Sequence, residues 1–202
     1  MSHVLVIKSS AAGQGSVSNQ LIDQFRNSYA AGHVEATFIE HDLGRHPLAP
    51  LSSLNLAGFA GQASESALEI ELATTSDRLT SEVENADVLV IGAPMYNFGI
   101  TALLKTWFDY VLRAGRTFKY TEAGPVGLLT GKKAIVVETR GGLYSEGPAA
   151  ALDSQEPHIR TMLGFIGITD VTFIRAEKLA FGPDAKDEAV DRARSDLIQL
   201  AA

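Results

Sequence analysis

Short apolar segments alternate along the chain with longer segments in which apolar residues recur every three or four positions. Three of the short segments, Val4–Ile7, Asp87–Ala93 and Lys133–Thr139, are nearly continuous apolar runs. Such runs are typical of parallel strands that are buried on both faces. Val34–Ile39 and Val171–Ile174 are shorter and more polar, and they complete a set of five predicted strands.

Helical spacing of apolar residues predicts five helices between and after these strands. The positions that carry the spacing are Val17, Leu21, Ile22, Phe25 and Tyr29; Leu68, Leu72, Leu79, Val83 and Ala86; Ile100–Leu112; Ile159, Met162, Leu163 and Ile166; and Val190, Ala193, Leu197 and Leu200. The Pro-, Ser- and Gly-rich stretch Gly44–Ser64 predicts a long loop with room for a short helix. Phe118–Tyr120 and Val126–Leu128 predict a loose hairpin or an excursion from the fold.

Strands that alternate with helices indicate an α/β protein in which a doubly wound parallel sheet carries helices on both faces. Right-handed crossovers leave few topologies for five strands. We predict the flavodoxin-like strand order 2-1-3-4-5, in which strands one and three are neighbours at the point where a ligand crevice opens. The length of 202 residues and the lack of a linker predict a single domain over residues 1–202.

Composition removes several classes of function. The chain has no cysteine, which excludes disulfides, thiolate metal sites, iron–sulfur clusters and cysteine nucleophiles, and which fits a reducing cytoplasm. The net charge of -7 argues against nucleic acid as a partner, and no basic amphipathic segment favours a membrane surface. We see no secretory signal and no run long enough to span a membrane. The five histidines lack metal-ligand spacing, so we expect no metal site.

The loop after the first strand, Lys8–Ser18, is rich in serine and glycine. It opens a predicted helix, and a helix N-terminus favours a phosphate through its unpaired amides and its partial positive charge. Ser16 and Ser18 can donate hydroxyl groups to phosphate oxygens, and Gly13 and Gly15 allow a close backbone approach. The alternative is that these serines only cap the helix. The third glycine of a dinucleotide fingerprint is missing here.

The loop after the third strand, Pro94–Gly99, places Tyr96 and Phe98 on either side of Asn97. Carboxyl ends of parallel strands are where α/β sheets bind ligands. The aromatic pair can cover a flat ring while Asn97 hydrogen-bonds its heteroatoms. The alternative is a turn whose aromatic side chains fill the core.

The fourth strand ends in Thr139, Arg140, Gly141 and Gly142. Two glycines after an arginine can expose successive amides as an anion-binding nest. Directed at the pyrimidine edge of a flavin, such amides would stabilise the negative charge that forms on reduction. A plain left-handed loop is the alternative.

Taken together, these motifs resemble the bacterial FMN-dependent NADH azoreductases, which are also called FMN-dependent NADH:quinone oxidoreductases. The segments that carry the resemblance are Ser9-Ser10 with Ser16-x-Ser18-Asn19, Ala93–Phe98, Phe118–Thr121, Gly131–Ala134, Arg140–Gly142 and Leu163–Ile168. The resemblance covers nearly the whole chain, and Pro-Met-Tyr-Asn-Phe is its most specific part. Leu143–Arg160 and Gly44–Thr80 are its variable regions.

The resemblance implies a homodimer with a flavodoxin-like fold and one FMN per subunit near the dimer interface. It also implies ping-pong hydride transfer, in which NADH reduces FMN and leaves before a quinone or an azo compound accepts two electrons. NADPH stays possible as the donor. The physiological acceptor is not identified by the sequence.

The resemblance also assigns roles to residues. The positions that it implies for cofactor binding are Ser10, Ser16, Val17, Ser18, Met95, Tyr96, Asn97, Phe98, Thr139, Arg140, Gly141 and Gly142. Thr139 stands where a serine is common and keeps the hydroxyl group. Tyr120 and Met162 match positions that shape the substrate site across the interface, and an aromatic residue is frequent near the latter. Asn97, Gly141 and Gly142 are our candidates for tuning the flavin, which itself carries the hydride.

Two other classes of function share these features. A flavodoxin-type FMN electron carrier without its own substrate would use the same fold and cofactor. The aromatic stretch Phe118–Tyr120 and the long loop Gly44–Ser64 favour an enzyme with a substrate pocket and dimer contacts. A non-redox α/β binding domain is the third interpretation.

Overall fold

The computed structural model describes residues 2–53, 55 and 66–201. Its centre is a five-stranded parallel sheet in the order β2-β1-β3-β6-β7. The strands are β1 (His3–Lys8), β2 (Thr37–Asp42), β3 (Val88–Pro94), β6 (Lys133–Thr139) and β7 (Asp170–Ala176). The predicted order 2-1-3-4-5 is confirmed, because β4 (Phe118–Thr121) and β5 (Gly124–Gly127) form a separate antiparallel hairpin.

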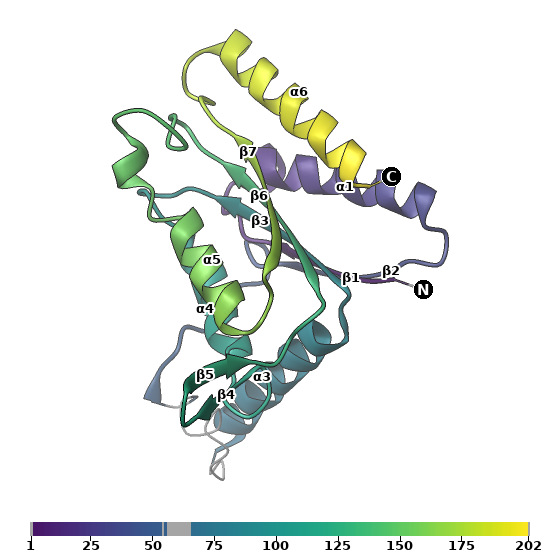
Figure 1. Cartoon of the computed structure of the whole chain (residues 1–202), viewed down its shortest axis with the longest axis vertical. Coiled ribbons are helices and arrows are strands. Elements are labelled where there is room, and N and C mark those ends of the chain that lie inside the picture. Colours follow the sequence, from purple (N-terminus) through teal and green to yellow (C-terminus); the bar gives the residue numbers. More distant parts are fainter. Residues whose placement is uncertain (1, 54, 56–65, 202) are drawn as a thin grey trace.

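Helices cover both faces of this sheet (Figure 1). Helices α1 (Val17–Gly32) and α6 (Pro183–Leu200) lie on one face, and α3 (Ala67–Asn85), α4 (Ala102–Val111) and α5 (Glu156–Phe165) lie on the other. They are the five predicted helices. Short 3-10 turns at Gly13–Gly15 and Ala150–Leu152 precede α1 and α5.

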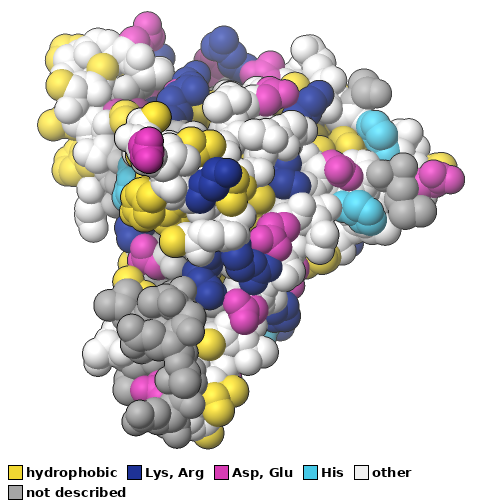
Figure 2. All heavy atoms as spheres, turned by 60° about the horizontal axis from the view of Figure 1, so that its bottom comes forward, with side chains coloured by type: hydrophobic (Ala, Val, Ile, Leu, Met, Phe, Trp, Pro, Cys, Tyr) yellow, Lys and Arg dark blue, Asp and Glu magenta, His cyan; other side chains and the backbone are white. Residues whose placement is uncertain are grey.

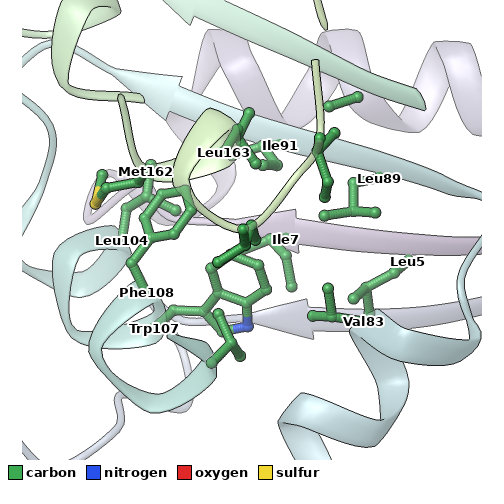
Figure 3. Packing of buried hydrophobic residues seen from close by; sticks show 14 of the residues in the cluster. Leu5, Ile7, Val83, Leu89, Ile91, Leu104, Trp107, Phe108, Met162 and Leu163 are labelled. Carbon is green, nitrogen blue, oxygen red and sulfur yellow. The ribbon is translucent and has the colours of Figure 1, made fainter. Parts of the chain in front are cut away.

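Strand side chains alternate between two hydrophobic cores, as the pleat of a doubly covered sheet requires. In β1, Leu5 and Ile7 join the core under α3, α4 and α5, whereas Val4 and Val6 join the core under α1 and α6. Figure 3 shows Trp107 of α4 in the larger core, near Ile7 of β1. Trp107 is fully buried, as the sequence predicted for a core residue.

The second strand starts later than the sequence predicted. Val34 is exposed and lies in a turn, closed by the amide of Ala36 donating to the His33 carbonyl, and β2 continues to Asp42 instead of ending at Ile39. Strand β2 forms an edge of the sheet and is partly exposed. At such a strand the hydrophobic pattern is a weak guide to where the strand begins and ends. Residues 54 and 56–64 of the predicted long loop lie outside the described residues, so the short helix expected within this loop stays a prediction.

Two leucines predicted on the buried faces of helices are largely exposed. Leu68 in the first turn of α3 is 49% exposed and Leu200 at the end of α6 is 39% exposed. Each lies in a terminal turn of its helix, the first turn of α3 and the last turn of α6.

The predicted hairpin is present and is held by backbone contact with the turn after α5. A Cβ atom on Gly127 would lie 2.1 Å from the Gly167 amide nitrogen, so this approach requires glycine. The Leu129 amide also donates to the Ile166 carbonyl. The hairpin follows the C-terminal end of α4, whereas the Pro94–Gly99 loop precedes its N-terminal end (Figure 1). A ten-residue helix of about 15 Å therefore separates them within one chain.

Among the described residues, no helix has the combination of length and apolar composition needed to cross a membrane. The described residues likewise contain no group of three histidine or acidic side chains that could hold a metal ion.

Candidate functional site

The three loops singled out from the sequence meet at the carboxyl edge of the sheet. The Met95 amide donates to the Thr139 carbonyl at 2.9 Å, which joins the loop after β3 to the end of β6. The Ala11 amide donates to the Tyr96 hydroxyl at 3.2 Å, which joins it to the loop after β1. Because β1, β3 and β6 are parallel neighbours, their carboxyl ends place these loops side by side.

The loop after β1 presents buried hydroxyl groups to the start of α1. Ser16 is the N-cap residue of α1 and accepts a hydrogen bond from the Asn19 amide at 3.2 Å. The Ser18 hydroxyl lies 3.1 Å from the Ser16 hydroxyl, and Ser18 is fully buried. Ser10 accepts a hydrogen bond from the Ala12 amide. Capping therefore explains Ser16 but not Ser18, whose hydroxyl group accepts no helix amide within the described part of the chain.

Ser9 and Lys8 point elsewhere. The Ser9 hydroxyl donates to the Gly92 carbonyl at 2.6 Å and ties β1 to β3. The Lys8 ammonium lies between Asp23 at 2.6 Å and Glu40 at 2.7 Å. Burial lowers the pKa of Lys8, but its hydrogen bonds to the two carboxylates outweigh burial and raise that pKa. An anion at the start of α1 would therefore be held by neutral donors and by the helix dipole.

A second polar group near the same helix end lacks a partner. The Oδ1 atom of Asn19, in the first turn of α1, is buried and has no hydrogen-bond partner within the described part of the chain. Asn19 lines a cavity of about 580 Å³ together with Ala11, Gly13 and Gly44. A Cβ atom on Gly44 would lie 2.0 Å from the Ser10 carbonyl oxygen, so the chain passes this loop at contact distance.

The loop after β3 is a tight two-residue turn with a strained backbone. Asn97 and Phe98 have φ angles of 49° and 71°, and the amides of Tyr96 and Gly99 each donate to the other's carbonyl. Two successive positive φ angles define the hairpin turn that asparagine favours at its first central position. A phenylalanine in the left-handed region is uncommon and costs free energy.

The aromatic side chains of this turn do not fill the core. Tyr96 is 38% exposed and Phe98 is 47% exposed. The alternative of a turn that only contributes core residues is therefore wrong, because the turn projects its side chains from the edge of the sheet. Met95, next to them, is half-buried.

The loop after β6 bends at Gly141 and Gly142 without left-handed backbone. Neither Gly141 nor Gly142 has a positive φ angle, so the alternative of a plain left-handed loop is wrong. Their carbonyls accept the amides of Ala180 and Lys178, and their own amides have no hydrogen-bond partner within the described residues. Thr139 is nearly buried.

Arg140 lies inside the protein, in a cluster of charged groups. Its guanidinium contacts Glu138 at 2.7 Å, Asp153 at 3.1 Å and Glu177 at 3.2 Å. Burial and the pairs with Glu138 and Asp153 act in opposite directions, and the pKa of Arg140 is raised. The side chain that the resemblance implied for cofactor binding is therefore fully enclosed by protein groups.

Glu138 beneath this loop is fully buried, and its Oε1 atom has no hydrogen-bond partner among the described residues. Burial is the largest cause that raises the pKa of Glu138 to about 8. Arg140 opposes this shift, whereas the neighbouring carboxylates Glu156 and Asp153 add to it. Burial of Glu138 therefore favours its protonated form, whereas the contact with Arg140 favours its charged form.

Tyr144 completes the edge and was missed from the sequence. Its ring packs edge-on against Phe98, with centroids 6.1 Å apart and planes at 80°. A Cβ atom on Gly142 would lie 3.0 Å from the Tyr144 ring, so glycine permits this contact. Tyr144 lies in Leu143–Arg160, which was set aside as variable, and its only signal was an aromatic residue just after Arg140-Gly141-Gly142.

The two residues assigned to the substrate site belong to other elements, Tyr120 to the hairpin and Met162 to α5. Tyr120 is 73% exposed on the hairpin, with its ring edge-on to Phe118. Met162 is 6% exposed and belongs to the larger core, where Figure 3 shows it beside Leu104 and Phe108. Their roles stay predictions.

The histidines show no catalytic arrangement in the described part of the chain. His33 caps α1, with its ring at 3.2 Å from the Tyr29 carbonyl. His41 lies 2.6 Å from Glu82, and this contact helps to lower the pKa of Glu82 against the effect of burial. Both interactions fit the structural roles that the sequence suggested for the histidines.

Comparison with known proteins agrees with this architecture. The family model described as flavodoxin-like fold matches residues 2–201 of this chain. A protein of Hyphomonas neptunium named FMN-dependent NADH:quinone oxidoreductase is 50% identical over 201 residues, which cover 100% of this chain and 96% of that protein. A protein of the same name from Azotobacter vinelandii is 49% identical, with full coverage of both chains.

Solved structures extend the similarity to the whole backbone. An azoreductase from Bacillus anthracis has a TM-score of 0.90 at 32% identity, covering 100% of this chain and 99% of that one. A second Bacillus anthracis structure, an FMN-dependent NADH-azoreductase in complex with FMN, has a TM-score of 0.90 at 25% identity and covers 98% of that chain.

Proposed function

The chain belongs to the flavodoxin-like family that includes the FMN-dependent NADH:quinone oxidoreductases, and we propose that it is such an enzyme. Its reaction is the FMN-dependent, NAD(P)H-driven two-electron reduction of quinones, together with the reductive cleavage of azo compounds. The donor and the acceptor react in turn at one cofactor, in a ping-pong sequence. The observation that carries the proposal is the full-length identity of 50% to a relative with this name.

The residues at the carboxyl edge fit FMN in chemistry. A helix N-terminus can bind a phosphate through neutral donors, and the hydroxyls of Ser10, Ser16 and Ser18 lie there. The buried Oδ1 of Asn19, which lacks a described partner, is an acceptor, so a ligand hydroxyl group and not a phosphate oxygen would satisfy it. Tyr96 and Phe98 expose aromatic surface that a flat ring would cover.

In this proposal the chain binds and orients the cofactor. Val17 and the three serines hold the phosphate, while the segments Met95–Phe98 and Thr139–Gly142 hold the ring. Asn97 and the amides of Gly141 and Gly142 donate to the edge on which negative charge forms. Preorganised donors at such an edge stabilise developing charge at little reorganisation cost.

No acid–base residue is required by this assignment. FMN, when bound, supplies the two-electron chemistry, and the protein contributes orientation, electrostatics and exclusion of water. Tyr96, Phe98 and Tyr144 supply the apolar walls that limit water at the ring. NADH is the donor implied by the relatives' names, and NADPH stays an untested alternative.

The proposal includes a homodimer formed by single-domain chains of residues 1–202, in a reducing cytoplasm. The position of Tyr120 supports the dimer. The length of α4 separates Tyr120 from the cofactor loops of its own chain, so Tyr120 would reach a cofactor site only in a second chain. The face that bears the hairpin shows hydrophobic side chains beside lysines and arginines (Figure 2). Exposed apolar groups there include Tyr120, Val126 and Leu128.

An anaerobic titration tests the proposed activity. The FMN-reconstituted protein is titrated with NADH and then with benzoquinone, while flavin absorbance is recorded, and a parallel titration uses NADPH. Bleaching by NADH and full recovery with one equivalent of benzoquinone is the expected result. A bound flavin that ignores both nucleotides would contradict the proposal and indicate an electron carrier that a separate reductase serves.

A further inference from the structure

Arg140 is enclosed by protein although it lies in a loop at the edge of the sheet. Its side chain has 0% exposure, as does that of its partner Glu138. Lysine and arginine are rarely buried to this extent unless every charge is paired. The Arg140 side chain points inward from the loop that follows β6. It is therefore separated from a ligand at the outer surface of that loop.

The guanidinium uses each of its nitrogen atoms for a different part of the chain. Its Nε donates to the Gln155 side-chain oxygen at 2.8 Å, and its Nη2 donates to Glu138 at 2.7 Å. Its Nη1 donates to Glu177, just past β7, at 3.2 Å. The planar fork of arginine can join three such partners at fixed angles, which an ammonium group cannot.

These partners continue the network into both cofactor loops. The side-chain amide of Gln155 donates through Nε2 to the Ala93 carbonyl at 2.5 Å, immediately before the Pro94–Gly99 turn. The neighbouring Ser154 amide donates to the Phe98 carbonyl at 3.0 Å, within the strained turn itself. Glu177 accepts the Tyr144 amide at 2.8 Å and so anchors the aromatic residue that packs on Phe98.

We infer that Arg140 is a positioning residue that fixes the Pro94–Gly99 turn and the Thr139–Tyr144 segment in one arrangement, before the cofactor binds and without touching it. This inference rests on the proposed function for the identity of the cofactor. This hydrogen-bond network explains how Phe98 keeps its left-handed backbone, because a strained backbone persists only where surrounding contacts determine it. Buried charge pairs of this kind supply a defined geometry more reliably than net stability.

The test compares Gln155→Met, Arg140→Lys and Arg140→Met with a matched control, Arg116→Met. Gln155→Met cuts the link from Arg140 to β3 without leaving a buried charge unpaired. Arg116 also has several partners, contacting Glu84 at 2.6 Å and Asp77 at 3.2 Å, but these residues lie outside the cofactor loops. Each protein is measured for FMN Kd by fluorescence, for the absorption spectrum of bound FMN, and for amide hydrogen exchange without cofactor.

We expect Gln155→Met and Arg140→Lys to raise the FMN Kd about tenfold and to shift the flavin spectrum. In the same apo proteins, amides of residues 95–99 and 141–145 should exchange at least tenfold faster, with the Arg116→Met protein unchanged in both respects. If Arg140→Met fails to fold, the other two variants carry the test. The exchange result does not involve FMN, so it distinguishes failure of this inference from failure of the proposed function.

Two results would overturn the inference. One is a Gln155→Met protein with wild-type FMN Kd and wild-type exchange, together with weakened binding in Arg140→Lys, which would show that Arg140 contacts the cofactor directly. The other is lowered thermal stability in all three variants with FMN Kd within twofold of wild type, which would leave Arg140 with a purely structural role.

Discussion

The two edges of the sheet use similar residues in opposite ways. At the amino edge, Lys132 donates to the carbonyls of Glu84 and Ala86 and satisfies the end of α3. At the carboxyl edge, three non-glycine residues, Asn97, Phe98 and Lys178, occupy left-handed backbone, and a buried glutamate oxygen has no described partner. Arginine networks lie at both edges, half-buried around Arg116 and enclosed around Arg140.

The difference shows which edge is built for stability and which for a ligand. Strain, exposed aromatic rings and unpaired buried polar atoms each reduce the stability of a free protein. Natural proteins violate local rules of this kind mainly at functional sites. All described non-glycine residues with a positive φ angle lie at the edge where the three motifs meet, and this backbone strain marks that edge independently of any relative.

The serine pair at the start of α1 should give the largest effect. We expect Ser16→Ala combined with Ser18→Ala to raise the FMN Kd about 100-fold, or about 2.7 kcal/mol, because two phosphate donors are lost. Loss of the Ser16 cap should also lower the unfolding free energy by about 1 kcal/mol. Fluorescence titration and urea unfolding measure the two effects.

The control for this change is Ser66→Ala, which removes the N-cap of α3. It should lower stability by a similar amount while FMN affinity stays at the wild-type value. Equal FMN affinity in the double serine variant would show that these serines only cap the helix.

Asn97 gives the next effect, and two substitutions separate its side chain from its backbone. Asn97→Gly keeps the positive φ angle and removes the amide, so we expect FMN Kd to rise about tenfold at wild-type stability. Asn97→Ala should show the same loss of affinity and in addition about 1 kcal/mol of destabilisation from the left-handed backbone. Isothermal titration and thermal unfolding distinguish the two. If Asn97→Gly binds FMN with wild-type affinity and is reduced by NADH as the wild type is, the Asn97 side chain does not contribute to the binding site.

Glu138 predicts a pH dependence of stability. Its pKa is about 8 when folded and near 4.5 when unfolded, so between these values the folded chain holds a proton that the unfolded chain has released. Stability should therefore fall as pH rises through this window, by at most about 1.4 kcal/mol per pH unit. The lowered pKa values of Glu82, Glu156 and Glu177 change the pH dependence of stability only below pH 4.5. The lowered pKa of His158 changes it only below pH 6.5.

The interval from pH 6.5 to 8 isolates Glu138 from these groups. Urea unfolding in this interval should show declining stability for the wild type and a flatter profile for Glu138→Gln, which stays neutral. Parallel profiles for the two proteins would mean that Glu138 is ionised in the folded state despite its burial.

Lys132 at the amino edge should give the smallest effect and should leave the cofactor site intact. Lys132→Met removes two hydrogen bonds to helix-terminal carbonyls, and we expect about 1 kcal/mol of destabilisation. FMN Kd should stay at the wild-type value. A changed Kd would break the distinction between the edges, because it would show that the amino edge controls the cofactor loops.

The site was predictable wherever the function lies in a contiguous motif. Ser16, Ser18 and the Pro94–Gly99 loop follow apolar strands, so strand prediction alone places them at the carboxyl edge. The cluster around Arg140 was not predictable, because Glu138, Gln155 and Glu177 become neighbours only when β6, β7 and the start of α5 come together. Tyr144 was missed for the same reason.

The sequence by itself determined the α/β class, the strand order and the three loops that meet at one edge. These features follow from local periodicity and from the narrow set of topologies that a parallel sheet allows. Only the tertiary structure decided that Arg140 faces inward, that Phe98 is strained and exposed, and that burial raises the pKa of Glu138. Burial and long-range pairing set side-chain direction and charge, and neither is encoded in the spacing of residues along the chain.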